Sequence, residues 1–364
     1  MKYIPAILRY LVGGLFIFSG LIKINDPVGT AIKMEEYFEV FSVNIAEFFH
    51  IFVPIALPVS VFMVVLEVVL GVALIIRYKQ NQTLYITTIL IIFFTFLTGY
   101  SAFTNTVTDC GCFGDAIKLT PWESFIKDIV LLVMLIILML SEHDVQSKTG
   151  EKISHFVIGG VTVISFSMAL WAIAHLPFID FRAYKIGNHI PTEMQPSAPY
   201  IYEYVMEKDG EEYVFDEYPS DESYKYVAMN HINPEAAPKI TDFAVWNDEG
   251  DFTETVFTGN KLFIILYDVS KTDIESIERI NSLIKALAGN VEVFALTASD
   301  KSVFEEFQIS TGLEISYYYT DATVLKTITR SNPGLWLLSE GTVVGKWHYN
   351  DVPSYGKILE MVNM

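Results

Sequence analysis

Residues 86–103, ITTILIIFFTFLTGYSAF, and residues 129–140, IVLLVMLIILML, are the clearest candidates for membrane spans in the 364-residue chain. A helix needs about 20 mostly apolar residues to cross the hydrocarbon core of a bilayer. The first half of the chain contains three further runs of this kind, so the sequence predicts five membrane-spanning helices. We place them at Ile4–Ile22, Phe52–Ile76, Leu84–Phe103, Trp122–Leu140 and Ile153–Leu176.

The two halves of the chain differ in charge. Residues 1–175 carry 10 Lys and Arg against 13 Asp and Glu, whereas residues 176–364 carry 14 against 30. The second half therefore reads as an acidic, water-soluble domain that begins near Pro177. A net charge of −19 and a pI near 4.7 exclude nucleic-acid binding, because that function needs a basic surface to neutralise phosphates. The lipid bilayer is the expected environment of the first half.

Lysine and arginine in the short loops indicate the orientation. The loop after the second span carries Arg77 and Lys79, and the loop after the fourth carries Lys148 and Lys152. Short cytoplasmic loops are enriched in these residues, so we expect both loops and the N-terminus in the cytoplasm. Loops 24–51 and 104–121 and the acidic half then lie outside. This topology predicts a protein of the inner, cytoplasmic membrane with a periplasmic C-terminal domain.

The acidic half has the element pattern of an α/β domain. Within its Tyr- and acid-rich first segment, two alternating runs flank Asp209-Gly210, a favoured hairpin turn. Farther on we expect strands at 261–268, 291–297, 335–339 and 343–347, and helices at 273–288, 301–308 and 357–362. This β-α-β-α-β-β-α order predicts helices layered on one sheet.

The order of these elements, with Asn332-Pro333 just before the strand GLWLL, resembles the thioredoxin fold. Residues 237–252, APKITDFAVWNDEGDF, are similar to the opening of membrane-tethered TlpA-like and peroxiredoxin-like thioredoxins. The resemblance covers residues 236–364 and implies a cis bond at Pro333, at the edge where clients bind. The family's Cys-x-x-Cys is replaced by residues 268–272, DVSKT. Because thiol–disulfide exchange needs a thiolate, this domain is expected to be redox-dead and to serve as a docking or structural module.

Both cysteines of the chain lie in residues 109–115, DCGCFGD, in the outer loop before the fourth span. Cysteines that face an oxidising compartment can pair. A bond between Cys110 and Cys112 would close a very small ring, so we expect it to be strained and easily reduced. An active or regulatory disulfide is our leading interpretation, and free buried thiols, a metal site or a structural disulfide are the alternatives. Two cysteines with scattered histidines do not supply the four ligands of a typical metal site.

Ionisable side chains lie in or beside the apolar spans. They are Arg9, Lys23, Glu67, Lys127 and Asp128, and such residues are costly in lipid unless they pair or face a polar cavity. Arg9 or Lys23 has the charge to pair with Glu67 or Asp128. We therefore expect an intramembrane polar cluster that either fixes helix packing or lines a pocket for a polar head group. Small residues that allow close approach of membrane helices are also present: Gly13, Gly14, Gly20 and Gly71.

Residues 8–38 resemble the N-terminal signature of DoxX-like membrane proteins. That signature has an arginine early in the first span and then Ser-Gly-x-x-Lys, which lies here at residues 19–23. Glu67 matches the acidic residue of that family's second span. The CGCFG motif and the span after it are similar to the MauE branch of the group. The resemblance covers residues 4–141 and implies a four-helix membrane core.

The MauE resemblance also implies a function. Proteins of that branch act beside a separate thioredoxin-like partner in maturing a disulfide-bonded periplasmic subunit. We therefore expect thiol–disulfide exchange, or an accessory role in it, through Cys110 and Cys112, with a periplasmic client or a separate thioredoxin-like partner. Some DoxX-like proteins are linked to quinone chemistry, which makes a quinone the candidate cofactor. The alternative is a non-enzymatic inner-membrane scaffold that presents a redox-dead thioredoxin-like domain.

The predicted fold class is an α-helical membrane bundle joined to an α/β thioredoxin-like C-terminal domain. Residues 1–145 are expected to form the DoxX- and MauE-like bundle, and residues 146–178 the fifth transmembrane helix. A Tyr- and acid-rich connecting segment follows at 179–235. Residues 236–364 are expected to form the thioredoxin-like domain without catalytic cysteines.

Overall fold

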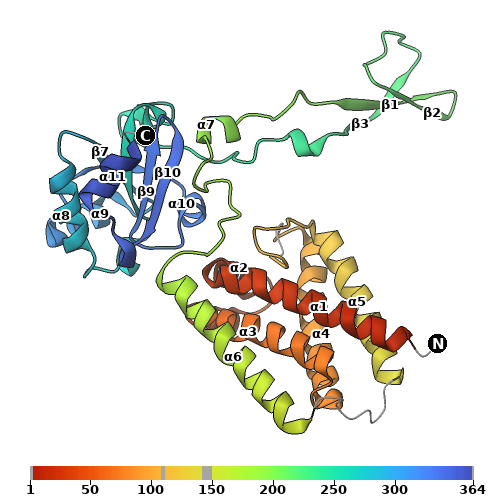
Figure 1. Ribbon diagram of the computed structural model, residues 1–364. Helices are drawn as coiled ribbons and strands as arrows, with labels where there is room; N and C mark the ends of the chain where they lie inside the picture. Colours follow the sequence, from red (N-terminus) through yellow and green to blue (C-terminus); the bar gives the residue numbers. More distant parts are fainter. Residues whose placement is uncertain (1–2, 108–110, 142–149, 363–364) are drawn as a thin grey trace. The chain divides into compact units, whose positions relative to one another are not determined.

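The computed structural model of the protein describes residues 3–107, 111–141 and 150–362 (Figure 1). The chain divides into two compact units, Met1–Phe181 and Arg182–Met364. The fifth predicted span therefore belongs to the first unit. Nearly all of the expected connecting segment 179–235 belongs to the second.

The first unit is helical. Among the described residues, five helices are long and apolar enough to cross a membrane, and the prediction of five spans is confirmed. The second of them runs from Glu47 to Ile76, because a 3-10 helix leads directly into α3. The helices are α1 (Ile4–Asn25), α2 (Pro27–Asn44), the 3-10 helix η1 (Glu47–Ile55), α3 (Ala56–Ile76), α4 (Gln80–Thr104), α5 (Pro121–Ser141) and α6 (Glu151–Ala174).

Helix α2 occupies a region that the sequence analysis treats as a loop. Asp26 precedes the helix, and its Oδ1 accepts a hydrogen bond from the Gly29 backbone N–H at 2.8 Å. Pro27 is the first helical residue, where its missing N–H costs nothing. Four charged residues, the first of them Lys33, interrupt the apolar pattern of α2. The helix was missed because the search was for continuous apolar runs.

Helices α1 and α3 touch backbone to backbone at two glycines. A Cβ atom added to Gly13 would lie 2.9 Å from the carbonyl oxygen of Gly71, and one added to Gly71 would lie 2.7 Å from that of Gly13. Farther along α1, a Cβ atom on Gly20 would lie 3.2 Å from the Cβ of Glu67. Gly14 has open space around it. Three of the four expected glycines therefore make close helix contacts.

The second unit is built on a seven-stranded sheet in the order β10-β9-β6-β7-β8-β4-β5. Strands β6, β7 and β8 run parallel, and the other recorded pairs are antiparallel. The strands are β4 (Trp246–Asn247), β5 (Gly250–Asp251), β6 (Asn260–Leu266), β7 (Glu292–Thr297), β8 (Ser316–Tyr319), β9 (Gly334–Ser339) and β10 (Thr342–His348). The helices are α7 (Ile190–Glu193), α8 (Ile277–Leu287), α9 (Lys301–Thr311), α10 (Ala322–Ile328) and α11 (Tyr355–Val362), with 3-10 turns η2 (Pro234–Ala236), η3 (Thr255–Phe257), η4 (Val269–Lys271) and η5 (Tyr349–Asp351). This α/β arrangement is the predicted thioredoxin-like fold.

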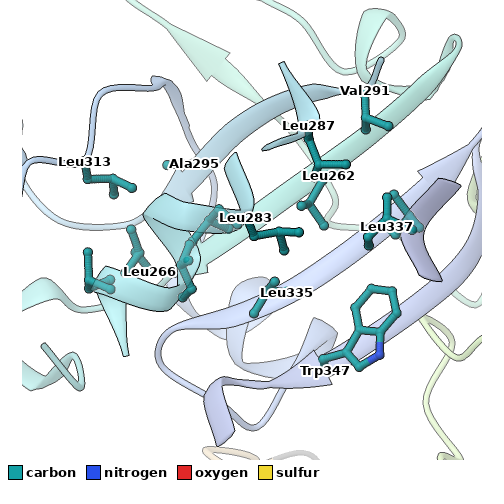
Figure 2. Close-up of a cluster of buried hydrophobic side chains, with 14 of the residues drawn as sticks. Leu262, Leu266, Leu283, Leu287, Val291, Ala295, Leu313, Leu335, Leu337 and Trp347 are labelled. Atoms are coloured by element: carbon teal, nitrogen blue, oxygen red, sulfur yellow. The ribbon is translucent and has the colours of Figure 1, made fainter. Parts of the chain in front are cut away.

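Strand β6 is buried on both faces, which explains its continuous apolar sequence. Side chains alternate across a strand, so Leu262 and Leu266 face one core while Phe263 and Ile265 face the other. The first core, shown in Figure 2, also includes Leu283 and Leu287 of α8, Leu335 and Leu337 of β9, and Trp347 of β10. The second core is completed by apolar side chains of α10 and of residues 240–245, which precede β4. The sheet thus lies between two apolar layers.

Several short elements of this unit were not predicted. Strand β8 has four residues, α10 has seven, and β4 and β5 have two each. Segments this short contain too little periodicity to be recognised. Helix α8 also begins later than expected, at Ile277, so that Ile274 lies outside the helix and is 64% exposed.

The Tyr- and acid-rich segment forms a separate three-stranded sheet in the order β2-β1-β3. The expected hairpin at residues 209–210 is confirmed, and both turn residues have positive φ, 55° and 84°. The third strand was not expected. The strands are β1 (Tyr202–Lys208), β2 (Glu211–Phe215) and β3 (Lys225–His231).

The glycine contact between α1 and α3 predicts the effects of two matched substitutions. Gly13→Ala should destabilise the protein by about 1–3 kcal/mol, because its new methyl group meets the backbone of Gly71. Gly14→Ala makes the same change where space is open, so stability should stay equal or rise slightly with helix propensity. Unfolding in detergent micelles, followed by circular dichroism, measures both. Equal losses for the two variants would contradict the contact.

Candidate functional site

Cys112 lies in a tight turn between α4 and α5. The Gly114 backbone N–H donates a hydrogen bond to the carbonyl oxygen of Gly111 at 3.1 Å. Both glycines have left-handed φ values, 63° and 50°, which glycine adopts at little cost. The turn places Cys112 near its tip, partly buried. Its predicted partner, Cys110, lies outside the described residues.

The end of this loop is fixed by the start of α5. The Thr120 backbone N–H donates to Glu123 Oε2 at 2.8 Å, and the Glu123 backbone N–H donates to Thr120 Oγ1 at 3.3 Å. This reciprocal pair is a capping box, and it defines the first turn of the helix. Helix α5 therefore starts at a fixed position close to the cysteine loop.

Phe113 attaches the loop to the helices. Its buried ring lies 5.7 Å from the ring of Phe18 on α1, measured between centroids. Lys127 of α5 places its Nζ 5.5 Å from the centre of the Phe113 ring. The charge of Lys127 also lies within electrostatic range of Cys112. The loop is thus held between α1 and α5, next to a cation.

A buried ion pair lies beneath this loop. Lys23 Nζ lies 2.5 Å from Glu67 Oε1, and their side chains are only 8% and 3% exposed. Of the pairings that the sequence leaves open, the structure forms this one. Lys23 Nζ also lies 4.9 Å from the centre of the Phe94 ring. The pair connects α1, α3 and α4 and leaves neither charge alone in an apolar environment.

Ser19 connects the ion pair to the cysteine loop. Its Oγ lies 3.0 Å from the carbonyl oxygen of Cys112 and 3.2 Å from Glu67 Oε2. A hydroxyl has one proton, so it donates to one of these acceptors at a time. Ser19 and Lys23 are four residues apart and share one face of α1. The sequence analysis did not select Ser19, although this spacing within the Ser-Gly-x-x-Lys motif could have identified it.

Asp128 is satisfied by other partners than the sequence suggests. Its Oδ1 lies 2.6 Å from Lys127 Nζ, and its Oδ2 accepts a hydrogen bond from Thr98 Oγ1 at 3.0 Å. Arg9 is buried on α1, 14 positions before Lys23, or about 21 Å along the helix axis. Arg9 therefore does not lie with the other predicted residues. Lys23 with Glu67 and Lys127 with Asp128 form two ion pairs, and Arg9 lies apart from both.

The segment after α6 returns to the same end of the bundle. Asn25, the last residue of α1, donates a hydrogen bond from Nδ2 to the carbonyl oxygen of Ile179 at 2.8 Å. The Ile179 backbone N–H donates to Asn25 Oδ1 at 2.9 Å. These two bonds hold the chain beside the end of α1, two residues after Lys23. The helical unit therefore ends on the side where Cys112 lies.

In the second unit, the Asn332-Pro333 peptide bond is cis. Asn332 Nδ2 donates to the carbonyl oxygen of Asp268 at 2.6 Å, and Thr272 Oγ1 donates to Asn332 Oδ1 at 3.3 Å. The Asp273 backbone N–H donates to the carbonyl oxygen of Asn332 at 3.1 Å. The loop that replaces the Cys-x-x-Cys is thus bonded to the proline loop. Pro333 is buried and is not exposed at an edge.

Asp268 is the acidic residue of this loop. Burial acts to raise the pKa of its carboxyl group, but hydrogen bonds to Oδ1 from Ser270 Oγ at 2.6 Å and Ser270 N at 3.0 Å act in the opposite direction. Lys271 Nζ lies 3.5 Å from Oδ2 and adds a favourable charge. The hydrogen bonds and the charge prevail, and the pKa is held below its ordinary value of 3.8.

The polar residues of the bundle do not fit a quinone. Lys23, Lys127 and Thr98 could each donate to a quinone carbonyl, but each is already bonded to a carboxylate. A quinone bound here would have to break an ion pair. These three donors therefore give no support to a quinone site, and the quinone stays a prediction. Within the described ranges, no three His, Cys, Asp or Glu side chains are grouped to hold a metal ion.

The buried ion pair predicts a strongly non-additive pair of substitutions. Glu67→Leu or Lys23→Met alone leaves one buried charge without its partner, which should cost about 3–5 kcal/mol. The double variant should regain most of this loss, because neither charge remains. Unfolding in mixed micelles measures the three variants. Simple addition of the two single losses would contradict the pair.

The lowered pKa of Asp268 predicts a pH-dependent contribution to stability. A depressed folded-state pKa stabilises the fold above the ordinary value of 3.8, and this contribution is lost as pH falls through the folded-state value. Asp268→Asn should therefore destabilise the second unit at neutral pH and have little effect near about pH 2. Denaturant unfolding followed by tryptophan fluorescence tests this. An equal loss at both pH values would contradict it.

Two comparisons with known proteins find similarities to this chain. Residues 1–141 match the family model described as methylamine utilisation protein MauE. The chain is 27% identical over 216 residues to Protein TlpB of Flavobacterium psychrophilum, which covers 56% of this chain and 55% of that protein. The chain thus spans about half the length of this curated relative.

No solved structure matches the chain. The wider DoxX-like resemblance stays a prediction, because the family match is to MauE alone. The roles expected of Cys110, Cys112 and the charged residues also stay predictions. The first four spans and the cysteine loop are thus similar to methylamine utilisation protein MauE, and the same chain joins them to a thioredoxin-like domain.

Proposed function

We propose that this protein is a membrane-bound thiol–disulfide exchange protein of the cell envelope that acts through Cys110 and Cys112. The supporting observation is the anchored loop. The carbonyl group of Cys112 lies against Ser19, and Ser19 lies against the buried pair of Lys23 and Glu67. A cysteine whose backbone is anchored to a buried ion pair fits a positioned reactive residue better than a passive loop.

The proposed exchange is balanced in atoms and electrons. A partner thiolate attacks one sulfur of a Cys110–Cys112 disulfide, a mixed disulfide forms, and the other cysteine leaves as a thiolate that takes up a proton. A second partner thiolate then attacks the mixed disulfide. The partner leaves with a disulfide, and the pair keeps two electrons and two protons. Lys127 Nζ lies 5.5 Å from the centre of the ring of Phe113, the residue next to Cys112, and would bring a positive charge close to a departing Cys112 thiolate.

We infer that the cysteine loop and the C-terminal unit lie on the periplasmic side of the inner membrane. The hydrogen bonds between Asn25 and Ile179 return the chain to the end of the bundle that carries the loop. Arg77 and Lys79 lie between α3 and α4, at the opposite ends of those helices, where a cytoplasmic loop is expected. The N-terminus would then lie in the cytoplasm.

The thioredoxin-like unit would hold the redox partner, either a periplasmic client or a separate thioredoxin-like protein. Its residues 268–272 contain no cysteine, so it contributes no thiol to the exchange. The same absence supports the competing function, a scaffold that binds proteins without redox chemistry. The two functions differ in whether Cys110 and Cys112 ever form a bond with another protein.

Single-cysteine variants distinguish these functions. In Cys110→Ser and Cys112→Ser, the remaining thiolate can still attack the disulfide of an oxidised partner, which is the proposed exchange in reverse. The second cysteine that would resolve this mixed disulfide is missing, so a covalent adduct should accumulate in intact cells. Acid quenching and a non-reducing gel should show the adduct in at least one variant, and reduction should remove it. The matched control is the double variant Cys110→Ser/Cys112→Ser, which should form none. Absence of an adduct from both single variants would overturn the exchange function and leave the scaffold.

A further inference from the structure

Strand β8 has an open outer edge. On one side, all four of its residues pair with β7, from Phe294↔Ser316 to Thr297↔Tyr319. On the other side, β4 pairs with it at a single position, Trp246↔Tyr319, in antiparallel orientation. Beyond that position, no strand in the described part of the chain covers β8. The backbone N–H and carbonyl groups that point to this side of β8 therefore have no neighbour among the described strands except at Tyr319.

The direction of these groups follows from the ladder. The Thr320 backbone N–H donates to the carbonyl oxygen of Thr297, toward β7. N–H directions alternate along a strand, so the N–H of Tyr318 also faces β7. The N–H and carbonyl group of Tyr317 then face the open edge, in line with Tyr319, which pairs with β4. Tyr317 is the residue that an added strand would bond.

A groove of about 880 Å³ runs along this edge. Its walls come from the β4–β5 turn, from the connection between α9 and β8, and from β8 itself. Residues that line it include Asp248, Glu249, Ile309, Glu314, Tyr317 and Tyr319. Ile309 is 85% exposed, and the rings of Tyr317 and Tyr319 lie 5.6 Å apart. The groove thus combines apolar and aromatic surface with a carboxylate rim.

The negative charges of the rim favour a basic binding partner. Asp248, Glu249 and Glu314 give it three carboxylates. One of them already binds an ammonium group of this chain, because Lys301 Nζ lies 2.6 Å from Asp248 Oδ2. A second copy of this acidic chain, an anionic lipid surface or a nucleic acid would bring like charges to the rim. A segment with lysine or arginine side chains would instead pair with the carboxylates and lay its aliphatic stems on the tyrosine rings.

We propose that the β8 edge binds an extended, basic segment of a partner protein by strand addition. The segment runs antiparallel to β8 and lies on the same side of β8 as β4, next to the part of the strand that β4 leaves unpaired. Its main chain bonds Tyr317, and alternate side chains meet the acidic rim. This binding is independent of the cysteine chemistry, since the groove lies wholly within the second unit.

A synthetic peptide tests the proposal on the full chain in detergent micelles. The probe is a ten-residue peptide of alternating valine and lysine, blocked at both ends. Its first control carries glutamate in place of lysine. Its second carries N-methyl groups on alternate residues, which keep the charge and remove the main-chain donors. Binding to the natural chain and to Cys110→Ser/Cys112→Ser should be equal, so failure here is distinct from failure of the exchange function.

The expected result is binding of the lysine peptide that weakens about tenfold or more with N-methylation, because main-chain bonds carry strand addition. Glu249→Lys/Glu314→Lys should weaken it to a similar extent. Glu278→Lys/Glu360→Lys makes the same charge change on exposed residues of α8 and α11 and should leave it nearly unchanged. Amide hydrogen exchange at Tyr317 should slow about tenfold or more, with no slowing at Tyr318.

Three results would overturn the proposal. The lysine peptide fails to bind, or the N-methylated peptide binds equally well, which would reduce the groove to a general acidic surface. Alternatively, the chain self-associates through this edge, and Ile309→Lys abolishes that association, which would make a second copy the occupant.

Discussion

The ion pair between Lys23 and Glu67 is the interaction on which the helical unit depends. A carboxylate midway along α3 is tolerated in an apolar bundle only with a cation beside it. That requirement brings the end of α1 against α3, and the absence of side chains at Gly13 and Gly20 makes the approach sterically possible. Ser19 extends the same set of contacts to the cysteine loop. Helix packing, charge burial and the position of Cys112 are therefore parts of a single arrangement.

Much of the architecture could be predicted because it depends on local composition. Long apolar runs identify the five spans, and a strand buried on both faces, such as β6, appears as a short unbroken apolar segment. Elements without such a signal were missed. Helix α2 mixes charges with apolar residues, and β8 and α10 owe their structure to the sheet and cores around them. Their sequences alone carry too few residues to show a period.

The candidate site was predictable in kind but not in detail. Charged residues in the spans predict that ion pairs exist. Which residues pair depends on how each helix is rotated about its axis, and composition does not determine that rotation. The structure selects Lys23 for Glu67 and Lys127 for Asp128, and it places Arg9 far along α1. Ser19 gives no such signal, because an uncharged serine in a membrane helix can bond its own backbone. Its role depends on the hydrogen bond to the carbonyl oxygen of Cys112, which lies 93 residues later in the chain.

The hydrogen bonds between Asn25 and Ile179 relate the number of membrane spans to the side on which the helical unit ends. With four spans, a chain that begins on one side also ends there, away from the loop between the third and fourth spans. The fifth crossing, α6, reverses that outcome and brings the exit of the bundle to the loop side. In the proposed topology, helix α6 thus places the start of the second unit in the same compartment as the cysteine loop. A soluble domain fused directly after α5 would be delivered to the compartment opposite Cys112, however well it folded.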